Sequence, residues 1–340
     1  MTAHDPSGRL VQRDLVVIAA SAGGVEALQR LVSTLPREFP APILVVLHVA
    51  SSGTSVLPQI LSRAGMLPAV FPADGDELRR GQVYVAPPDF HMLVDDGHVR
   101  LSRGPRENGH RPAADPLFRS AARSRGERVI GVVLSGLLDD GAGGLRFIKQ
   151  HGGATVVQAP EDAMFAGMPK AAIEATAVDR VVPIDAMATA LCELVEQEVA
   201  PDSEPGSADD DVGQLEPAIA ELVAEAAPTR LSCPECGGAL WEQEERGIVR
   251  YACHVGHAYS LHSLVEEQGR SLETTLWSAL RALQERADMQ RRLARRARSG
   301  AAHRRLETQA AEAERNAARL RELLQTVGRV APAELPLEAR

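Results

Sequence analysis

Three polar residues that together could form a hydrolase triad each follow an apolar run of the sequence. Ser21 follows LVVIAA, His48 follows ILVVL, and Asp140 lies shortly after VIGVVLSG. Such runs are typical of buried parallel strands, and in an open parallel sheet the active site forms outside the carboxyl ends of the strands. A serine hydroxyl needs a neighbouring base to act as a nucleophile, and a histidine oriented by a carboxylate supplies one. The three positions therefore predict a Ser-His-Asp site.

Each of these residues also has a simpler structural interpretation. Asp140 precedes Gly-Ala-Gly-Gly and could be a helix N-cap, while His48 could be a loop histidine whose hydrogen bonds are satisfied. Ser21 could be a cap, or part of a Gly-rich phosphate-binding loop. Taken singly these alternatives are favoured, but three matching positions together favour catalysis. The order Ser, His, Asp and the sequence AASAG argue against the α/β-hydrolase fold, and the lack of Gly-Lys-Ser or Gly-Lys-Thr excludes a Walker loop.

A second set of residues, late in the chain, has the spacing of metal ligands. Cys233 and Cys236 form a Cys-x-x-Cys knuckle, and Cys253 and His257 supply the second half of a tetrahedral set. The absence of a thioredoxin-like βαβ context argues against a redox pair. The spacing therefore predicts a structural zinc ion. Two other histidines remain alternative ligands, His254 and His262.

The elements that must position the Ser-His-Asp site alternate between short β-branched runs and amphipathic stretches. This alternation predicts an α/β fold with a doubly wound, mostly parallel sheet. The strands are expected at 15–20, 43–49, 69–72, 82–86, 129–135, 154–158 and 180–182. The helices are expected at 25–35, 55–63, 115–124, 144–151, 169–177 and 186–199. The segment 91–102 alternates around Asp-Asp-Gly and predicts a hairpin on the sheet edge.

Shifts in composition divide the chain further. We expect a flexible arm (1–13), a catalytic domain (14–199), an acidic linker (200–229), a small zinc-ribbon-like module (230–260), a helical tail (261–328) and a disordered tail (329–340). The helical tail should form a long helical hairpin broken near Ser299-Gly300. Its apolar positions at helical spacing are Leu276, Leu280, Leu283, Leu306, Leu320, Leu323 and Leu324. The arginines at 291–298 are interpreted as a solvated face, with an acidic partner as the alternative.

The bulk properties exclude several classes of function. A net charge of −9 argues against a nucleic-acid partner. The sequence has no secretory signal and no apolar run near ~20 residues, so we expect no membrane insertion and a cytoplasmic location. The hydrophobic content is 44%, but aromatic residues make up only 3%, which predicts a core of Ala, Val, Leu and Ile. Cys192 lies in a helical pattern and is interpreted as a small core residue.

A set of ordered motifs between Leu15 and Val195 resembles the catalytic domain of the chemotaxis receptor methylesterases, the CheB type. The motifs that carry the resemblance are Ala20–Gly24, Leu44–His48, Val83–His91, Arg111–Phe118, Val133–Ala142 and Gly167–Pro169. The resemblance implies that Ser21 attacks a methyl ester on a receptor glutamate and that His48 accepts the serine proton. It also implies that Asp140 orients His48.

The same resemblance identifies further features of the site. Asp140, and not Asp139, is the acid, because the family's acid directly precedes a Gly-Ala pair. By analogy, the backbone N–H groups of Ala22 and Leu137 would form the oxyanion hole. No cofactor is implied for catalysis, and glutamine deamidation is a related activity. The implied partner is a methylated chemoreceptor-like protein, and the C-terminal helices could bind a signalling partner.

The chain also departs from the family pattern. Ala22 stands where the family often has threonine, and Leu137-Leu138 stands where it often has Met-Gly. The family's well-known architecture has an N-terminal receiver domain, whereas fourteen residues precede the first predicted strand here. We therefore expect a stand-alone esterase that is regulated in another way. The alternative is a non-catalytic receptor or signalling adaptor with a degenerate esterase domain.

Overall fold

The computed structural model describes residues 10–48, 55–199, 227–245 and 247–327. It divides into two compact units, of which the first ends at Leu264 and the second begins at Val265. The first unit contains the predicted catalytic domain and the cysteine-containing module. The second contains most of the helical tail.

The centre of the first unit is a seven-stranded sheet in the order β10-β9-β8-β2-β3-β5-β4. All neighbouring strands in it are parallel, so the predicted doubly wound architecture is confirmed. The strands are β2 (Leu15–Ala20), β3 (Ile43–Leu47), β4 (Ala69–Val70), β5 (Val83–Val85), β8 (Val129–Val133), β9 (Ala154–Gln158) and β10 (Arg180–Val182). The chain runs from β2 towards β3 on one side and later returns to β8 on the other side of β2. The topological switch point therefore lies between β2 and β8, which is where ligand sites form in such sheets.

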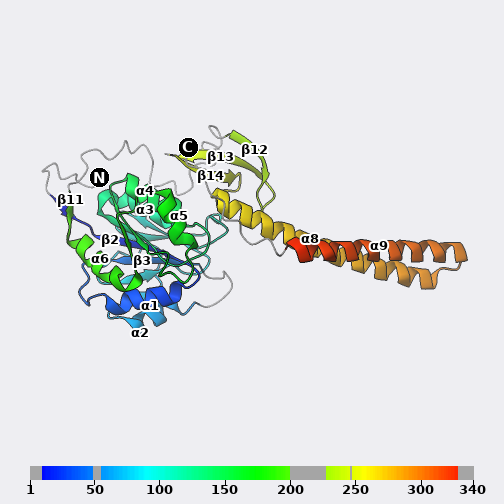
Figure 1. The fold of residues 1–340 in the computed structure, drawn as a ribbon, viewed down its shortest axis with the longest axis horizontal. Helices are drawn as coiled ribbons and strands as arrows, with labels where there is room; N and C mark the ends of the chain where they lie inside the picture. Colours follow the sequence, from blue (N-terminus) through cyan, green and yellow to red (C-terminus); the bar gives the residue numbers. More distant parts are fainter. Residues whose placement is uncertain (1–9, 49–54, 200–226, 246, 328–340) are drawn as a thin grey trace. The chain divides into compact units, whose positions relative to one another are not determined.

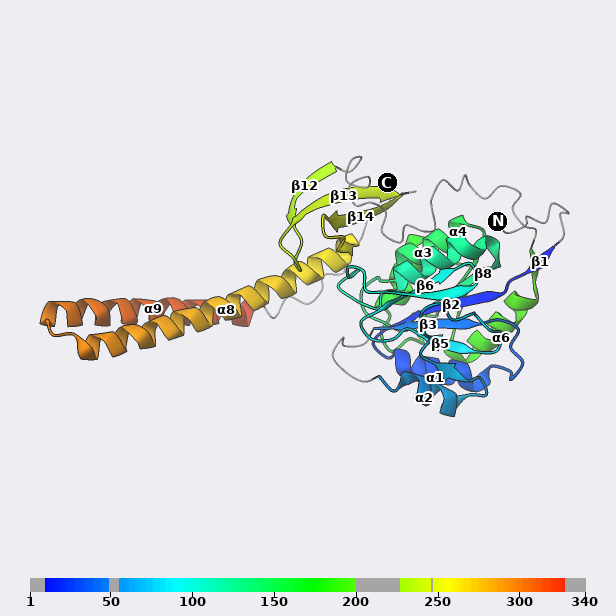
Figure 2. The same ribbon diagram turned by 180° about the vertical axis from the view of Figure 1, so that it is seen from behind.

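Helices cover both faces of the sheet (Figures 1 and 2). On one face lie α1 (Gly24–Thr34), α2 (Leu57–Ala64) and α6 (Ile184–Glu196). On the other lie α3 (Ala114–Arg125), which a 3-10 turn (Gly126–Arg128) follows, α4 (Ala142–Gln150) and α5 (Gly167–Ala175). Because the crossovers are right-handed and the chain leaves β2 first in one direction and later in the other, helices are expected on both faces.

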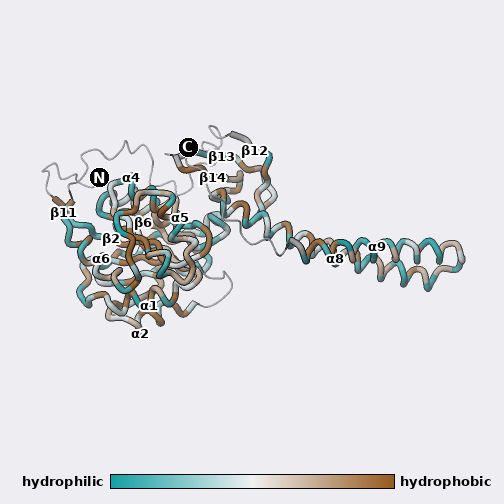
Figure 3. Tube along the Cα trace, viewed as in Figure 1, coloured by the Kyte–Doolittle hydropathy of each residue, from teal (hydrophilic) through white to brown (hydrophobic). Residues whose placement is uncertain are grey.

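The sheet is apolar on both faces, and its strands are brown in the hydropathy colouring of Figure 3. In β2, Val16 and Ile18 pack against one helical layer, while Leu15 and Val17 pack against the other. Successive side chains of a strand point to opposite faces, which explains why every residue of β2 is buried. This burial holds the end of β2 in place and so positions the next residue, Ser21.

Two parts of the sheet region differ from the prediction. The hairpin β6 (His91–Asp95) and β7 (His98–Ser102) forms a two-stranded sheet of its own and does not lie on the edge of the main sheet. Its apolar side chains, among them Met92, Val94 and Val99, pack with helix α3 in the core on that face of the sheet instead. The segment expected to be a flexible arm contains β1 (Val11–Gln12), which pairs with β11 (Glu198–Val199). Helix α6, which was expected to reach residue 199, ends at Glu196.

The cysteine-containing module is a four-stranded antiparallel sheet, β12-β13-β14-β15. Its strands are β12 (Ala227–Ser232), β13 (Ala239–Glu245), β14 (Ile248–Cys253) and β15 (Ala258–Tyr259). Strand β12 includes residues 227–229, which we predicted to be part of the acidic linker. The rest of the predicted linker, at 200–226, lies outside the described residues, as does the whole of the predicted C-terminal tail at 329–340. We call residues 227–264 the Cys3His module.

The helical tail forms the predicted hairpin. Helix α8 (Leu261–Arg296) is followed by α9 (Gly300–Val327), with the break next to Ser299. The two helices pack through a cluster formed by Leu276, Leu280, Leu283, Ala317, Leu320 and Leu324. Leu323 is exposed and not part of this core, and Arg291 of the basic run pairs with Glu314. Among the described residues, no helix combines the length and apolar composition that crossing a bilayer requires.

Candidate active site and metal centre

Ser21 and His48 leave adjacent strands of the sheet side by side. Strands β2 and β3 are parallel neighbours in which Ala20 pairs with Leu47, and the two polar residues come directly after this pair. The backbone N–H of His48 donates to the carbonyl of Ala20 at 3.2 Å, and the N–H of Ser21 donates to the carbonyl of Ser135 at 3.0 Å. The register of the sheet thus brings the predicted nucleophile and base together.

A tight turn connects Ser21 to helix α1. Gly23 is the N-cap of α1 with a φ of 70°, a left-handed conformation that glycine adopts without steric cost. A Cβ at Gly23 would lie 2.8 Å from both the Cβ of Met164 and the Oγ of Ser135. The Ser135 hydroxyl also donates to the carbonyl of Ala22 at 2.8 Å. Since Gly23 occupies the cap position, Ser21 is not the N-cap of this helix.

His48 contacts Asp140 directly. Its Nε2 lies 2.7 Å from Oδ2 of Asp140, and the two side chains are 6% and 2% exposed. The imidazole of His110 stacks on that of His48, with the ring centroids 3.9 Å apart and the planes within 9°. Because the carboxylate accepts a hydrogen bond from Nε2, a proton from Ser21 would go to Nδ1. The ring is therefore held on its edge by a carboxylate and on its face by a second ring.

The Asp140 carboxylate is held by three further donors. They are the backbone N–H groups of Ala114 (2.6 Å) and Asp115 (3.3 Å) and the side-chain Nδ2 of Asn108 (2.9 Å). The N-cap of α4 is Gly141, so Asp140 does not cap its own helix but accepts from the first turn of α3. Burial opposes ionisation of Asp140, but the hydrogen bonds from His48, Ala114 and Asn108 outweigh it and hold its pKa below the usual range. Asp140 is thus a buried carboxylate that stays charged beside an imidazole.

Asp115 is a second buried carboxyl group next to this network. It accepts hydrogen bonds from the backbone of Gly141 (3.1 Å) and Gly144 (2.7 Å), at the start of α4, and from Nδ2 of Asn108 (3.0 Å). Burial and the neighbouring charge of Asp140 raise the pKa of Asp115 to about 7. Two buried carboxyl groups with opposite pKa shifts therefore share one asparagine.

The loops around Ser21 form an apolar rim. Leu137, Met164 and Phe165 are 54%, 64% and 38% exposed. Hydrogen bonds from Gly136 N to Phe165 O (3.0 Å) and from Met168 N to Gly136 O hold the two loops together. In the described part of the chain, the backbone N–H groups of Ala22 and Leu137 donate no hydrogen bond to another protein group, as an oxyanion hole requires. Their role as such a hole remains a proposal.

Sequence reasoning missed four residues that build this site: Asn108, His110, Asp115 and Ser135. Asn108 and His110 come directly before the Arg111–Phe118 motif, and Asn-Gly at 108–109 does indicate a turn. No spacing pattern, however, indicates that this turn reaches Asp140. Ser135 lies in the Val133–Ala142 motif and Asp115 in the Arg111–Phe118 motif, but the sequence pattern assigns neither of them a role.

The Cys3His module brings the four predicted metal ligands together. The ligand atoms of Cys233, Cys236, Cys253 and His257 all lie within 4.8 Å of one another. The Sγ atoms of Cys236 and Cys253 are 3.6 Å apart, and Nδ1 of His257 lies 3.7 Å from Sγ of Cys233 and 3.5 Å from Sγ of Cys253. A tetrahedral zinc ion with ordinary bond lengths separates its ligand atoms by about 3.5 to 3.8 Å. The residues therefore fit zinc.

Residues next to the ligands also suit a metal site. Nε2 of His257 lies 3.5 Å from a carboxylate oxygen of Glu235, and such a contact fixes which imidazole nitrogen faces the metal. The alternative ligands lie elsewhere: His254 is exposed, and Nδ1 of His262 lies 3.5 Å from a carboxylate oxygen of Asp139. Cys192 lies in α6, packed against the core of the main sheet as expected.

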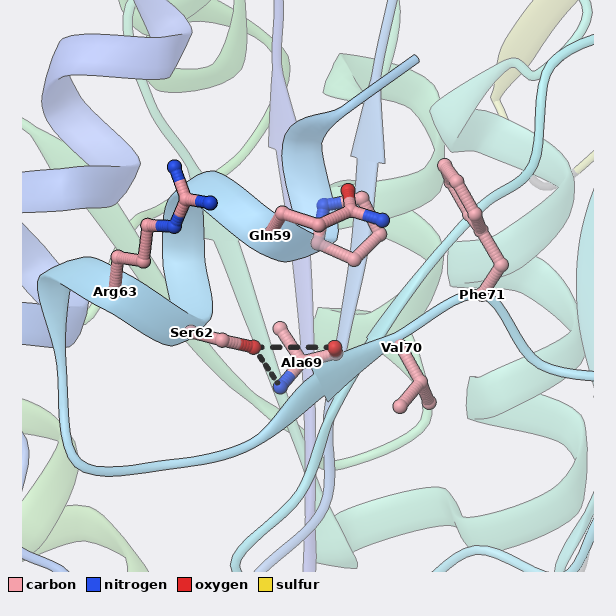
Figure 4. Close-up of a pocket in the computed structure, with 7 residues that line it drawn as sticks. Gln59, Ser62, Arg63, Ala69, Val70 and Phe71 are labelled. Carbon is pink, nitrogen blue, oxygen red and sulfur yellow. Dashed lines mark hydrogen bonds between the residues drawn. The ribbon is translucent and has the colours of Figure 1, made fainter. Parts of the chain in front are cut away.

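A pocket of about 540 Å³ lies between α2 and β4, apart from these residues (Figure 4). The hydroxyl of Ser62 in its wall donates to the carbonyl of Ala69 at 3.2 Å and accepts from the N–H of Ala69 at 2.8 Å. This serine is therefore satisfied within the fold. Its neighbours in the lining include no histidine and no carboxylate, so the pocket has no chemistry comparable to that around Ser21.

The fold and these residues place the chain in the class of doubly wound α/β domains with a serine, a histidine and a buried carboxylate near the carboxyl ends of the strands. The chain belongs to the CheB methylesterase family, whose model matches residues 16–191. A solved relative, the CheB methylesterase catalytic domain of Thermotoga maritima, has a TM-score of 0.52 and 35% identity, and the match covers 54% of this chain and all of that one.

Curated relatives carry consistent names. A protein-glutamate methylesterase/protein-glutamine glutaminase of Anaeromyxobacter dehalogenans is 44% identical over 55% of this chain and 54% of its own length. A protein of Leptospira interrogans with the same name, marked as putative, is 39% identical over 52% of this chain and 91% of its own. The chain thus spans about half the length of the first relative and most of the second.

Proposed function

We propose that this chain is a protein-glutamate methylesterase in which Ser21 is the nucleophile, His48 the general base and Asp140 the residue that orients His48. The observation that carries the proposal is the 2.7 Å contact between His48 and the buried Asp140, beside a serine on the neighbouring strand. The substrate would be a methyl-esterified glutamate side chain of a chemoreceptor-like protein, as the names of the relatives suggest.

The first half of the reaction would transfer the glutamyl group to the serine. Nδ1 of His48 takes the Ser21 proton while Oγ attacks the ester carbonyl, and the Asp140 carboxylate stabilises the imidazolium that forms. The N–H groups of Ala22 and Leu137 would donate to the oxyanion, each worth ~3 kcal/mol. When the tetrahedral intermediate collapses, the imidazolium proton goes to the leaving methoxy group and methanol departs.

The second half would hydrolyse the acyl-serine. His48 takes a proton from water, the resulting hydroxide attacks the acyl carbonyl, and the imidazolium returns the proton to Ser21 Oγ. A glutamine side chain reaches the same acyl-serine with loss of ammonia, so deamidation fits the same site. The non-catalytic adaptor is not favoured, because an adaptor has no need for a charged carboxylate buried against an imidazole.

Methanol release from a methylated chemoreceptor preparation tests this proposal. The wild-type chain should release methanol, and Ser21→Ala should lower release to background. Ser33→Ala is a matched control, because Ser33 is exposed on α1 and its hydroxyl donates to the carbonyl of Arg30 in the same helix. Equal release by Ser21→Ala and the wild type would overturn the mechanism.

The Cys3His module would hold a structural zinc ion through Cys233, Cys236, Cys253 and His257. With all four positions filled by protein, such an ion would have no open site for substrate, so its contribution would be to folding. Cysteines that bind zinc as thiolates suit a reducing compartment, and we propose that the protein is cytoplasmic. The α8–α9 hairpin would offer a surface for a signalling partner.

A further inference from the structure

Asn108 lies between the Cys3His module and the proposed catalytic carboxylate. We propose that Asn108 is a positioning residue for Asp140 and that the Cys3His module, by holding Asn108, is a structural part of the esterase site. The inference rests on the proposed function for the roles of Ser21 and His48. It assigns a new role to residues that neither the triad nor the metal cluster includes.

Both polar atoms of the Asn108 side chain, Nδ2 and Oδ1, form hydrogen bonds. Its Nδ2 donates to Asp140 at 2.9 Å and to Asp115 at 3.0 Å, and its Oδ1 accepts from the backbone N–H of Ser260 at 2.9 Å. Two carboxyl groups on one side and an N–H group on the other determine the orientation of the amide. Because Asn108 is 4% exposed, water cannot readily replace the Ser260 donor.

The module also holds the backbone of Asn108. The N–H of Asn108 donates to the carbonyl of Ala258 at 2.8 Å, and the N–H of Ala258 donates to the carbonyl of Arg106 at 3.3 Å. These bonds pair β15 with the segment 106–108 in the manner of a parallel strand. Asn108 has a φ of 51°, in the left-handed region that asparagine adopts more readily than most other non-glycine residues.

Two further contacts join the module to the segments around Asn108 and Asp140. The Glu107 carboxylate meets Arg119 of α3 and Arg250 of β14, each at 2.7 Å. Although burial opposes it, these two guanidinium groups lower the pKa of Glu107 to about 2. The hydroxyl of Ser263 donates at 2.8 Å to the carboxylate of Asp139, the residue before Asp140. The module is thus fixed to the loop that carries the catalytic acid.

Consecutive residues lead from this interface to the metal ligands. His257 belongs to the cluster, Ala258 bonds the backbone of Asn108, the hydroxyl of Tyr259 lies 3.6 Å from Sγ of Cys233, and Ser260 bonds the side chain of Asn108. A module whose buried core is so small depends on its metal for a defined structure. Loss of the metal should therefore free Asn108.

The test uses the full-length, zinc-loaded chain and a fluorophosphonate probe, which reacts with an activated serine whatever the natural substrate is. Asn108→Ala should slow labelling of Ser21 by at least tenfold while the zinc content stays at one per chain. Without the amide donor, the Asp140 carboxylate is more basic and stabilises the imidazolium, so the acid limb of the pH–rate profile should move to higher pH. Asn316→Ala, at the chain's other asparagine, exposed on α9, is the matched control and should label at the wild-type rate.

A second pair of variants tests the link to the module. Ser260→Pro removes the backbone donor to Asn108, whereas Ser260→Ala keeps it and removes only the hydroxyl that accepts from Ser263 N. Ser260→Pro should label at least fivefold more slowly than Ser260→Ala. If Ser260→Pro does not fold, wild-type protein stripped of zinc by a chelator replaces it and should show slow labelling that zinc restores.

The outcomes separate this inference from the proposed function. Wild-type labelling of Asn108→Ala with an unmoved acid limb would overturn it, as would full labelling of both Ser260→Pro and the zinc-free chain. Failure of the wild type to release methanol, with Ser21 still labelled and sensitive to Asn108, would instead overturn the proposed substrate.

Discussion

Asp115 and Asp140 each accept hydrogen bonds from the start of the other's helix. Asp140, just before α4, accepts from the N–H groups of Ala114 and Asp115 in α3, while Asp115 of α3 accepts from Gly141 and Gly144 of α4. A helix N-terminus carries partial positive charge, so each carboxyl group is suited to its place. The arrangement locks α3 to α4 and fixes the carboxylate that faces His48.

This pairing predicts a pH dependence of stability. The pKa of Asp115 is raised to about 7, so between pH ~4 and about 7 the folded chain binds a proton that the unfolded chain does not. The free energy of unfolding should therefore fall as the pH rises through this window, by at most about 4 kcal/mol. Asp115→Asn still offers an acceptor to Gly144 and should abolish this slope. Urea unfolding at several pH values measures it, and an equal slope in the variant would contradict the assignment.

The two adjacent aspartates should differ sharply in their effect on activity. Asp140→Asn presents an amide to Nε2 of His48 and favours the wrong tautomer, which should lower kcat by about 10³- to 10⁴-fold. Asp139→Asn should cost far less, because Asp139 contacts Ser263 and His262 instead of His48. Methanol release measures both, and a larger loss in Asp139→Asn would reverse the assignment.

The metal cluster predicts one zinc ion per chain. Elemental analysis of chain purified without chelators should find it, and Cys253→Ser should lose it together with the folded module. Cys192→Ser is the matched control, since Cys192 lies in α6 outside the cluster, and it should keep the metal. Absence of zinc in the wild type, or its retention by Cys253→Ser, would count against the proposed site.

Leu138 carries backbone strain that glycine would relieve. Its φ of 61° costs an L-residue about 1–2 kcal/mol, whereas glycine pays about 0.5–1 kcal/mol in chain entropy. Leu138→Gly should therefore keep or raise the free energy of unfolding, by up to about 1 kcal/mol. Thermal unfolding measures it. A loss of stability would mean that packing of the half-buried leucine outweighs the strain.

The strand-end residues could be read from the sequence because apolar runs and the parallel-sheet rule are local and general. Ser21 and His48 directly follow such runs and Asp140 lies shortly after one, while the Cys-x-x-Cys spacing indicates the metal cluster. The partners of Asp140 could not be read this way. Asn108 and His110 act through tertiary contacts of a turn, and the pairing of β1 with β11 joins segments far apart in the chain.

The separation between Asn108 and Ser260, 152 residues along the chain, bears on how the molecule is made. A ribosome delivers the whole parallel sheet before it delivers the N–H group that Asn108 accepts from, and contacts of such long range form late in folding. Until Ser260 has been synthesised, Asn108 of a nascent chain lacks its backbone hydrogen-bond donor. Assembly of the last strands would complete the site, so the activity proposed for this chain would be complete only once its distant C-terminal part had been synthesised.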